Sequence, residues 1–288
     1  MNTEPVKQLD SYELVARPMV MADIPSLHAL SIGVSWPHRP EDWEMLIRLG
    51  HGVVAEDAIG RVVGSAMWWS MDPDFARIGM VITTPRLQEQ GAARWLMQQI
   101  MRPIGARDMA LTATREALRL YLSLGFKLGA TVFQLQGNVT KAPAVVPGAR
   151  SMTAAHEAAV RALDAAALGA KRREVLDALL AVSTGTVVER DGKVVGFALC
   201  RRFGRGHVVG PVVAASERHA LALISPHVAA HAGQFLRLDT QEAEGPVKDY
   251  LEACGLSLFD TGTSMTLGRE RPPNGPARFF GLASHSLG

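Results

Sequence analysis

The sequence predicts an α/β fold that occurs twice in the 288-residue chain, each copy a mixed sheet with helices on both faces. Two observations support this prediction: an internal repeat and the order of the expected elements. Residues 60–67 (GRVVGSAM) return 132 residues later as 192–199 (GKVVGFAL), and residues 120–126 return 130 residues later as 250–256. Because self-similarity at a fixed separation indicates duplicated structural units, two copies of one fold account for the length.

In the first copy, apolar residues recur with a period of two in some segments and with a helical period in others. One expected helix opens with Pro40, carries Glu41 and Asp42 in its first turn and stops at Gly50, as helix boundaries favour. Strands are expected near 13–18, 52–56, 61–70, 75–83, 109–113 and 126–136, and helices over 21–30, 39–49, 92–102 and 115–124.

The second copy is expected to repeat this order after a linker. Two prolines and a glycine at 141–148 suit a connection, which gives domains 1–140 and 150–288 joined by a linker at 141–149. The tail, 269–288, holds too many chain-breaking residues for a regular element, so we expect an extended strap or a loose segment. Helices are expected over 154–168 and 173–182, and strands near 186–190, 194–202, 207–214, 235–239 and 257–267.

Composition bears on the class of protein. Lys and Arg total 30 against 28 Asp and Glu, so the net charge of +2 gives no reason to expect a nucleic-acid partner, and we expect Arg201, Arg202 and Arg205 to lie in a solvated turn. The sequence has neither a signal-peptide pattern nor an apolar run of about 18 residues, which predicts a cytoplasmic protein without a membrane partner. Cys200 and Cys254 stand alone, so we expect reduced core residues and no metal site.

The loop at 84–96 (TPRLQEQGAARWL) joins an expected strand to an expected helix. A glycine turn that opens a helix gathers backbone N–H groups at the positive end of the helix dipole, where a phosphate can bind. Gly91 permits close approach, Ala92 and Ala93 leave the helix start uncluttered, and two arginines flank them. Neither a P-loop nor a Rossmann fingerprint is present. An ordinary turn glycine explains the same residues, and the loop alone does not decide between the two.

The order of two motifs resembles that of the GNAT superfamily of acyl-CoA-dependent N-acetyltransferases. Gln88, Gly91 and Ala93 form a Gln-x-x-Gly-x-Ala pattern after a strand, and 117–126 (ALRLYLSLGF) follows about thirty residues later. The resemblance covers roughly residues 12–136, and the internal repeat extends it to the second half. The chain resembles two-domain bacterial GNAT proteins in which an N-terminal catalytic domain precedes a degenerate GNAT-like domain, each with a mostly antiparallel, twisted sheet flanked by helices.

The resemblance implies acetyl-CoA as the acyl donor. It places the coenzyme pyrophosphate on the loop and the pantetheine arm on the preceding strand, through Met80, Val81, Ile82, Gln88, Glu89, Gln90, Gly91, Ala92, Ala93 and Arg94. It also implies that Tyr121 is the general acid, although a core aromatic on a helix face is the alternative for Tyr121. Two positions depart from the family pattern: Glu89 stands where a small residue is usual, and Thr114 where many relatives have asparagine.

The implied reaction is direct attack of a small-molecule amine on an acyl thioester, without a metal, by a monomer or homodimer. The general base is left open among His38, Asp42, His51, Glu56, Asp57 and a water relay. Candidate acceptor-site residues are Trp36, His38 and Asp239, and the tryptophans at 36, 43, 68 and 69 suit either an acceptor pocket or the core.

Two other functions fit the same sequence: a non-catalytic sensor of acyl-CoA or of an amine, and acetylation of protein lysines or N-termini. The second copy is not expected to bind coenzyme. It has no glycine at the position of the cradle, and Leu251 replaces the tyrosine while Tyr250 falls one place early, about 100 degrees away on a helix.

Overall fold

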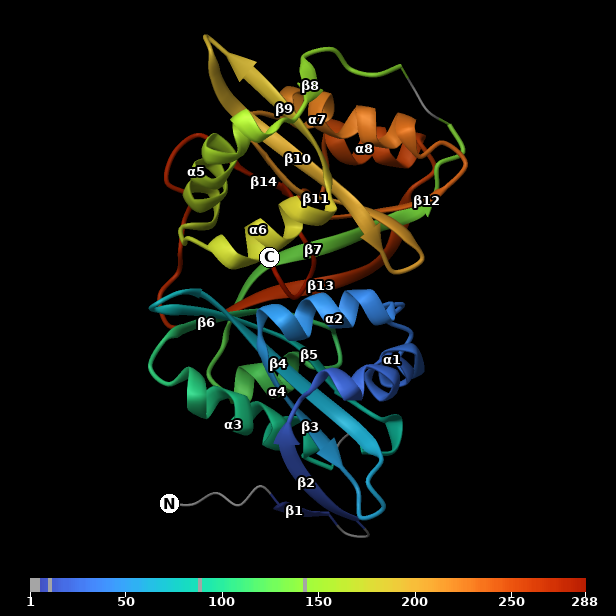
Figure 1. The fold of residues 1–288 in the computed structure, drawn as a ribbon, viewed down its shortest axis with the longest axis vertical. Coiled ribbons are helices and arrows are strands. Elements are labelled where there is room, and N and C mark those ends of the chain that lie inside the picture. Colours follow the sequence, from blue (N-terminus) through green and yellow to red (C-terminus); the bar gives the residue numbers. More distant parts are fainter. Residues whose placement is uncertain (1–5, 10–11, 88–89, 142–143) are drawn as a thin grey trace. The chain divides into compact units, whose positions relative to one another are not determined.

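The structure is a computed structural model that describes residues 6–9, 12–87, 90–141 and 144–288. The chain divides into two compact units, Met1–Met109 and Ala110–Gly288, and each contains strands and helices (Figure 1). None of the helices in these residue ranges is both long and apolar enough to cross a membrane. The boundary between the units falls inside the first sequence repeat, which runs on to β7 (Lys127–Asn138).

In the first unit, five strands form an antiparallel sheet in sequence order, and each lies within a few residues of its expected range apart from the first, which was not expected. The strands are β1 (Val6–Leu9), β2 (Tyr12–Pro18), β3 (His51–Glu56), β4 (Val62–Asp72) and β5 (Phe75–Thr83). The helices are η1 (Met21–Asp23), α1 (Ile24–Gly33), α2 (Pro40–Leu49), η2 (Pro85–Leu87) and α3 (Ala92–Ile104).

Helices cover both faces of this sheet, as the sequence predicts. Gly64 of β4 lies against Leu96 of α3, whereas Trp69, five residues further along the same strand, donates its indole N–H to the carbonyl of Leu46 in α2 (3.0 Å). Side chains alternate between the two faces of a strand, so residues five apart point in opposite directions. Trp69 and Trp43 are fully buried, and the Trp43 indole donates to a serine hydroxyl at 3.2 Å, which makes both rings core residues.

The second unit contains a longer mixed sheet, in which β11 and β12 are parallel and the other pairs with recorded register are antiparallel. Its strand order is β6-β13-β7-β12-β11-β10-β9-β8, and β14 pairs with β11. Before β7 lie β6 (Asp108–Ala113) and α4 (Leu118–Ser123). The strands after β7 are β8 (Ala149–Ser151), β9 (Thr184–Arg190), β10 (Lys193–Phe203), β11 (Gly206–Ala214), β12 (Phe235–Thr240), β13 (Ser257–Leu267) and β14 (Arg278–Gly281). The helices after β7 are η3 (Ala154–His156), α5 (Glu157–Leu168), α6 (Arg173–Val182), α7 (Glu217–Ala230) and α8 (Pro246–Ala253).

The last strands of the two sequence repeats exchange places. β13 closes the second repeat as β7 closes the first, yet β7 pairs with β12, the penultimate strand of the second repeat, and β13 lies beside β6, the penultimate strand of the first. β7 and β13 also pair with each other from Gln136–Ser257 to Lys127–Thr266. Each repeat therefore lends its final strand to the other repeat.

The tail packs as an extended strap, one of the two expected outcomes, but the expectation that it forms no regular element was wrong. Residues 278–281 form β14, because β11 offers backbone groups that an extended segment can pair with. Nearly all of 280–288 is buried. Proline and glycine lower the local preference of the tail for a regular element, but pairing with the distant strand β11 outweighs that preference.

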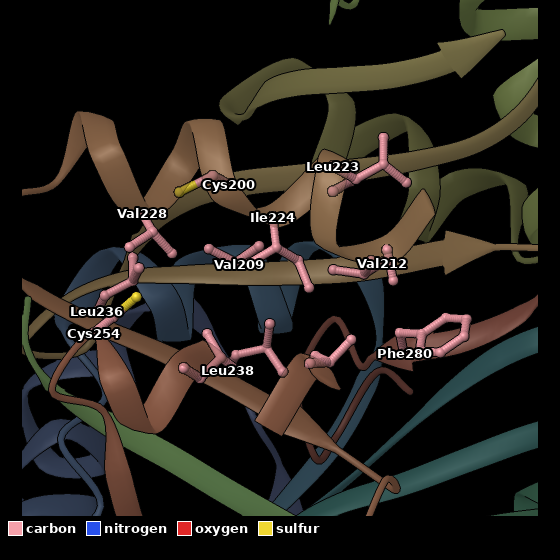
Figure 2. Packing of buried hydrophobic residues seen from close by; sticks show 14 of the residues in the cluster. Cys200, Val209, Val212, Leu223, Ile224, Val228, Leu236, Leu238, Cys254 and Phe280 are labelled. Carbon is pink, nitrogen blue, oxygen red and sulfur yellow. The ribbon is translucent and has the colours of Figure 1, made fainter. Parts of the chain in front are cut away.

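One face of the second sheet forms an apolar core with α7 and α8 (Figure 2). Cys200 and Cys254 are both buried in this core as free thiols, as the sequence predicts. Phe280, from the tail, is buried in the same cluster. The core of the second unit thus contains side chains from β7 through to its last strand, β14.

A buried histidine in α7 should make stability depend on pH. His227 is buried beside the Thr186 hydroxyl (3.2 Å), and burial, with a smaller contribution from His231, lowers its pKa from 6.5 to about 4. Between these two values the unfolded chain binds a proton that the folded chain does not, so the free energy of unfolding falls as the pH is lowered, by about 2 kcal/mol at pH 5.

Urea unfolding at pH 7.5 and pH 5 measures this effect. His227→Gln should reduce the loss at pH 5, while His51→Gln, at an exposed histidine, should leave it unchanged. An equal loss in the native chain and in His227→Gln would contradict the assignment.

Candidate functional site

A β-bulge in β5 lies at the strand residues that the sequence singles out. Ser65 pairs with Ile82 and Met67 with Gly79, so Ala66 alone stands opposite two residues, Met80 and Val81. Met80 has a φ of 51°, in the left-handed region, and the Ser65 hydroxyl donates to its carbonyl at 2.8 Å. A bulge interrupts the strand ladder and turns backbone groups away from it, as is frequent beside binding sites.

The loop after β5 leads through η2 into α3, and Gly91 is the N-cap residue immediately before the helix. Gly91 has a φ of 79°, so it has a backbone reason to be glycine. In the described part of the loop no side chain caps α3, and the Gln90 side chain instead donates to the Arg86 carbonyl at 3.0 Å. Ala92 is buried, Ala93 is half-buried and Arg94 is exposed. The predicted contacts at Gln88 and Glu89 lie outside the described residues.

Lys7 is a basic residue near this turn that the sequence analysis missed. A Cβ atom placed on Gly91 would lie 3.8 Å from both Cε and Nζ of Lys7, which belongs to β1. No sequence signal marks this lysine. The strand that contains it, β1, was not expected, and Lys7 and Gly91 are far apart in the chain. Its ammonium group adds positive charge beside the helix N-terminus.

Tyr121 lies in α4 of the second unit. The side chain is buried, and its ring meets Phe126 edge-on with the centroids 5.9 Å apart. Burial raises the pKa of the Tyr121 phenol well above its ordinary value of 10, so the hydroxyl is protonated at neutral pH. The observed environment is compatible with both expected roles, a core aromatic and a proton donor.

Trp36 and His38 lie in the segment between α1 and α2, and both are half-buried. The His38 ring centroid is 6.2 Å from that of Trp36 and 6.2 Å from that of Trp43. The His38 carbonyl lies 2.8 Å from Nδ1 of His28, and Ser35 has a φ of 63°. The structure therefore brings both first-unit acceptor candidates into one small aromatic group.

The three carboxylates considered as general bases are engaged in local structure. Asp42 accepts the backbone N–H of Arg39 (2.8 Å) and pairs with its guanidinium, which fixes the start of α2. Glu56 forms an ion pair with Arg17.

Asp57 stabilises the turn between β3 and β4. Burial opposes its ionisation, but hydrogen bonds from the backbone and guanidinium of Arg61 outweigh burial and lower its pKa. His51 lies over Trp68 with the ring centroids 4.5 Å apart. His38, His51 and a water relay are the other candidates that the sequence leaves open for the general base.

Asp239, the second-unit acceptor candidate, is fully buried in β12. Arg237 donates to both of its carboxylate oxygens at 2.8 and 2.7 Å, and Nε2 of His285 lies 3.6 Å away. Burial opposes ionisation of Asp239, yet the charges of Arg237 and His285 lower its pKa. Within the described ranges, no three His, Cys, Asp or Glu side chains are grouped to hold a metal ion.

Arg201 corrects the expectation of a solvated turn. Its guanidinium is buried and donates to the carbonyls of Gly210 (3.1 Å) and Ala283 (2.8 Å), while Arg202 and Arg205 are exposed, as expected. A run of arginines marks a surface turn only when none of them finds buried carbonyl partners.

The second repeat differs from the first at the cradle and at the tyrosine position. Ser216 caps α7, its hydroxyl accepting the His219 backbone N–H at 3.3 Å. Leu251 is fully buried, whereas Tyr250 is half-buried at the edge of the apolar core. The one-residue offset thus turns Tyr250 away from the buried position, as the helical period predicts.

The sequence matches two family profiles, each described as an acetyltransferase (GNAT) domain, over residues 48–128 and 160–281. Together the matches span more than half of the chain. A search of curated protein sequences finds no match.

Solved structures share this fold. A Pyrococcus horikoshii protein provisionally named as an acetyltransferase has a TM-score of 0.79 at 18% identity, with 96% of each chain covered. A GCN5-related N-acetyltransferase from Sphaerobacter thermophilus has a TM-score of 0.63 at 18% identity, over 88% of this chain and 95% of that one. A tandem GNAT protein from the clavulanic acid biosynthesis pathway has a TM-score of 0.61 at 14% identity, over 89% and 99%.

At these identities the solved structures show the fold alone, and the profile matches identify the family of each half. The matched ranges agree with the internal repeat, since one contains residues 60–67 and the other residues 192–199. The chain belongs to the GNAT acetyltransferase superfamily and carries two of its domains in tandem.

Proposed function

We propose that the chain is an acetyl-CoA-dependent N-acyltransferase that transfers an acetyl group to the amine of a small molecule, with the coenzyme bound by the first repeat. The observation that carries the proposal is the order of two features along the chain. The bulge at Met80 in β5 comes first, and the turn before α3, where Gly91 has a left-handed φ, comes second. An extended ligand with a diphosphate at one end needs these two features in this order: backbone groups turned out of a sheet, then a helix N-terminus.

The residues present fit such a ligand. The start of α3 lacks a side-chain cap among the described residues, so its first N–H groups can serve an anion. Lys7 and the exposed Arg86 and Arg94 add positive charge to the same region. The backbone of Met80, Val81 and Ile82 would hold the two amides of the pantetheine arm, and Gln88, Glu89 and Gln90 would complete the loop around the diphosphate. Bound acetyl-CoA would supply the thioester that the amine attacks.

In the proposed reaction the amine nitrogen bonds to the thioester carbonyl carbon, the carbon–sulfur bond breaks, and the thiolate takes a proton. A backbone N–H at the bulge would support the carbonyl oxygen while charge develops on it. Tyr121 would donate the proton, since its phenol is protonated at neutral pH. The amine would lose its proton to water or to a histidine, since the carboxylates of Asp42, Glu56 and Asp57 hold ion pairs.

The acceptor group in this proposal is built on Trp36 and His38, whose rings lie together. Asp239 is left out of the proposed acceptor group, since its carboxylate accepts two hydrogen bonds from Arg237. The second repeat would bind no coenzyme, since Ser216 already uses a backbone N–H at the start of α7.

Gly91→Ala tests the cradle. A residue with a side chain is strained at a φ of 79°, and relaxation of that strain would move the N–H groups at the start of α3. Calorimetry should record coenzyme A binding that is weaker by about tenfold, which corresponds to about 1.4 kcal/mol. Gly60→Ala is the matched control, because Gly60 has a φ of 77° and open space around it. Equal binding by the two variants would contradict the cradle.

Tyr121→Phe tests the proton donor. Release of thiol from acetyl-CoA with a panel of small amines should fall by about 10²–10⁴-fold, the usual contribution of a general acid, while the affinity for coenzyme A stays the same. Tyr250→Phe, at the tyrosine of the second repeat, should keep the native rate. A native chain that binds coenzyme A but releases no thiol with any amine would be a sensor, and the catalytic proposal would then be withdrawn.

A further inference from the structure

The second repeat carries a bulge at the same place as the first. Ala198 pairs with Val212 and Cys200 with Val209, so Leu199 alone stands opposite Gly210 and Pro211. The repeated GKVVGFAL segment leads into β10, which β11 follows, just as GRVVGSAM leads into β4, which β5 follows. The strand geometry that we assign to pantetheine binding in the first repeat is therefore conserved within the chain, although the cradle is not.

On one side of β11, the partner strand changes at this bulge. Before the bulge, β11 pairs with β12 at His207 and Val208. After the bulge, its recorded partner is β14, which pairs with Val212, Val213 and Ala214. The tail thus enters where β11 turns away from its neighbour.

Close contacts confirm that the tail lies between β11 and β12. A Cβ atom on Gly281 would be 3.0 Å from Val212 on β11 and 3.5 Å from Leu238 on β12, and Leu282 donates its N–H to the Asp239 carbonyl of β12 at 2.8 Å. In Figure 2 the neighbouring Phe280 lies beside Val212 in the apolar core. The inserted segment therefore has a backbone bond to each strand.

The bulge itself is shaped to the tail. A Cβ atom on Gly210 would lie 1.9 Å from the Leu282 carbonyl oxygen, so only glycine permits this approach. Arg201 donates to the Gly210 carbonyl and to the Ala283 carbonyl, which joins the bulge to the tail through one guanidinium.

A second buried arginine holds the segment that follows. Arg172 donates to the carbonyls of Leu287 (2.7 Å) and Gly288 (2.5 Å) and forms an ion pair with Asp164, whose side chain is as buried as its own. A buried guanidinium is tolerated only where its donors find partners, so both arginines favour the docked tail.

We propose that residues 278–283 are an internal ligand of the second repeat, occupying the groove that in the first repeat takes the pantetheine arm. This proposal rests on the proposed function, because that function assigns pantetheine to the bulge at Met80. An extended peptide and pantetheine share the chemistry required: a narrow chain with amide N–H and carbonyl groups that pair with a strand edge. The second repeat then has a latent site for an extended, amide-bearing ligand, and the chain binds one coenzyme.

Hydrogen exchange on the full chain tests this proposal, with Gly210→Ala to displace the tail and Gly192→Ala, a turn glycine of the same repeat with open space around it, as the control. We expect Gly210→Ala to lose protection by about tenfold or more at the amides of 279–283 and 212–214, and the control to match the native chain. Millimolar pantetheine should then restore protection at 212–214 and leave 279–283 exposed.

Two outcomes would overturn the proposal: tail amides that stay as protected in Gly210→Ala as in the native chain, or amides at 212–214 that pantetheine does not protect. In the native chain, coenzyme A should protect 80–82 and 91–95 alone. If coenzyme A does not protect these amides, the proposed function is contradicted. The result at 212–214 still tests the internal ligand separately.

A complementation experiment covers the case in which Gly210→Ala does not fold. The full chain, with a protease site inserted after residue 275, is folded first and then cleaved, and a labelled peptide of residues 276–288 or a labelled peptide of the same composition in scrambled order is added. The labelled native-sequence peptide should exchange into the complex, the scrambled one should not, and pantetheine should displace the bound tail. Absence of peptide binding, or binding that pantetheine does not affect, would contradict an internal ligand.

Discussion

The extra residue in β5 and in β11 is the constraint on which the rest of the molecule depends. A bulged strand cannot stay in register with both of its neighbouring strands. Backbone N–H and carbonyl groups beyond the bulge therefore need hydrogen-bond partners from another segment or from a ligand. In the second repeat β14 supplies them. In the first repeat, Ser65 serves the Met80 carbonyl, and the remaining groups are where we place a bound cosubstrate. One geometric feature thus accounts for a strap in one half and for a binding strand in the other.

The two halves use their charges differently for the same reason. The tail of the second unit places carbonyl oxygens in the interior of that unit, where Arg172 and Arg201 donate hydrogen bonds to them. A buried guanidinium and a buried carbonyl each cost free energy unless they are hydrogen-bonded. Near Gly91, by contrast, the arginines stay at the surface. Buried guanidinium groups therefore bind main-chain carbonyls in the second unit, whereas the arginines near Gly91 lie at the protein surface.

Local pattern predicted most elements, and long-range pairing explains what it missed. Helices such as α2 and α5 have an apolar period and clear ends, which depend on neighbours in the chain, so the sequence places them closely. The exchange of β7 and β13, and the pairing that turns 278–281 into a strand, depend on partners more than 60 residues away, which no local pattern records. The site divides in the same way: Gly91 has a sequence signal, whereas Lys7 comes near it only through the pairing of β1.

The exchange of final strands bears on how this duplicated chain can evolve. A half cut at 141–149 would carry β7 without β12 and β13, which leaves two bare strand edges, and such edges invite aggregation. Loss of the second repeat by truncation would therefore leave β6 and β7 without their partner strands, whatever the second repeat binds. The second repeat is needed to complete this sheet independently of any chemistry of its own.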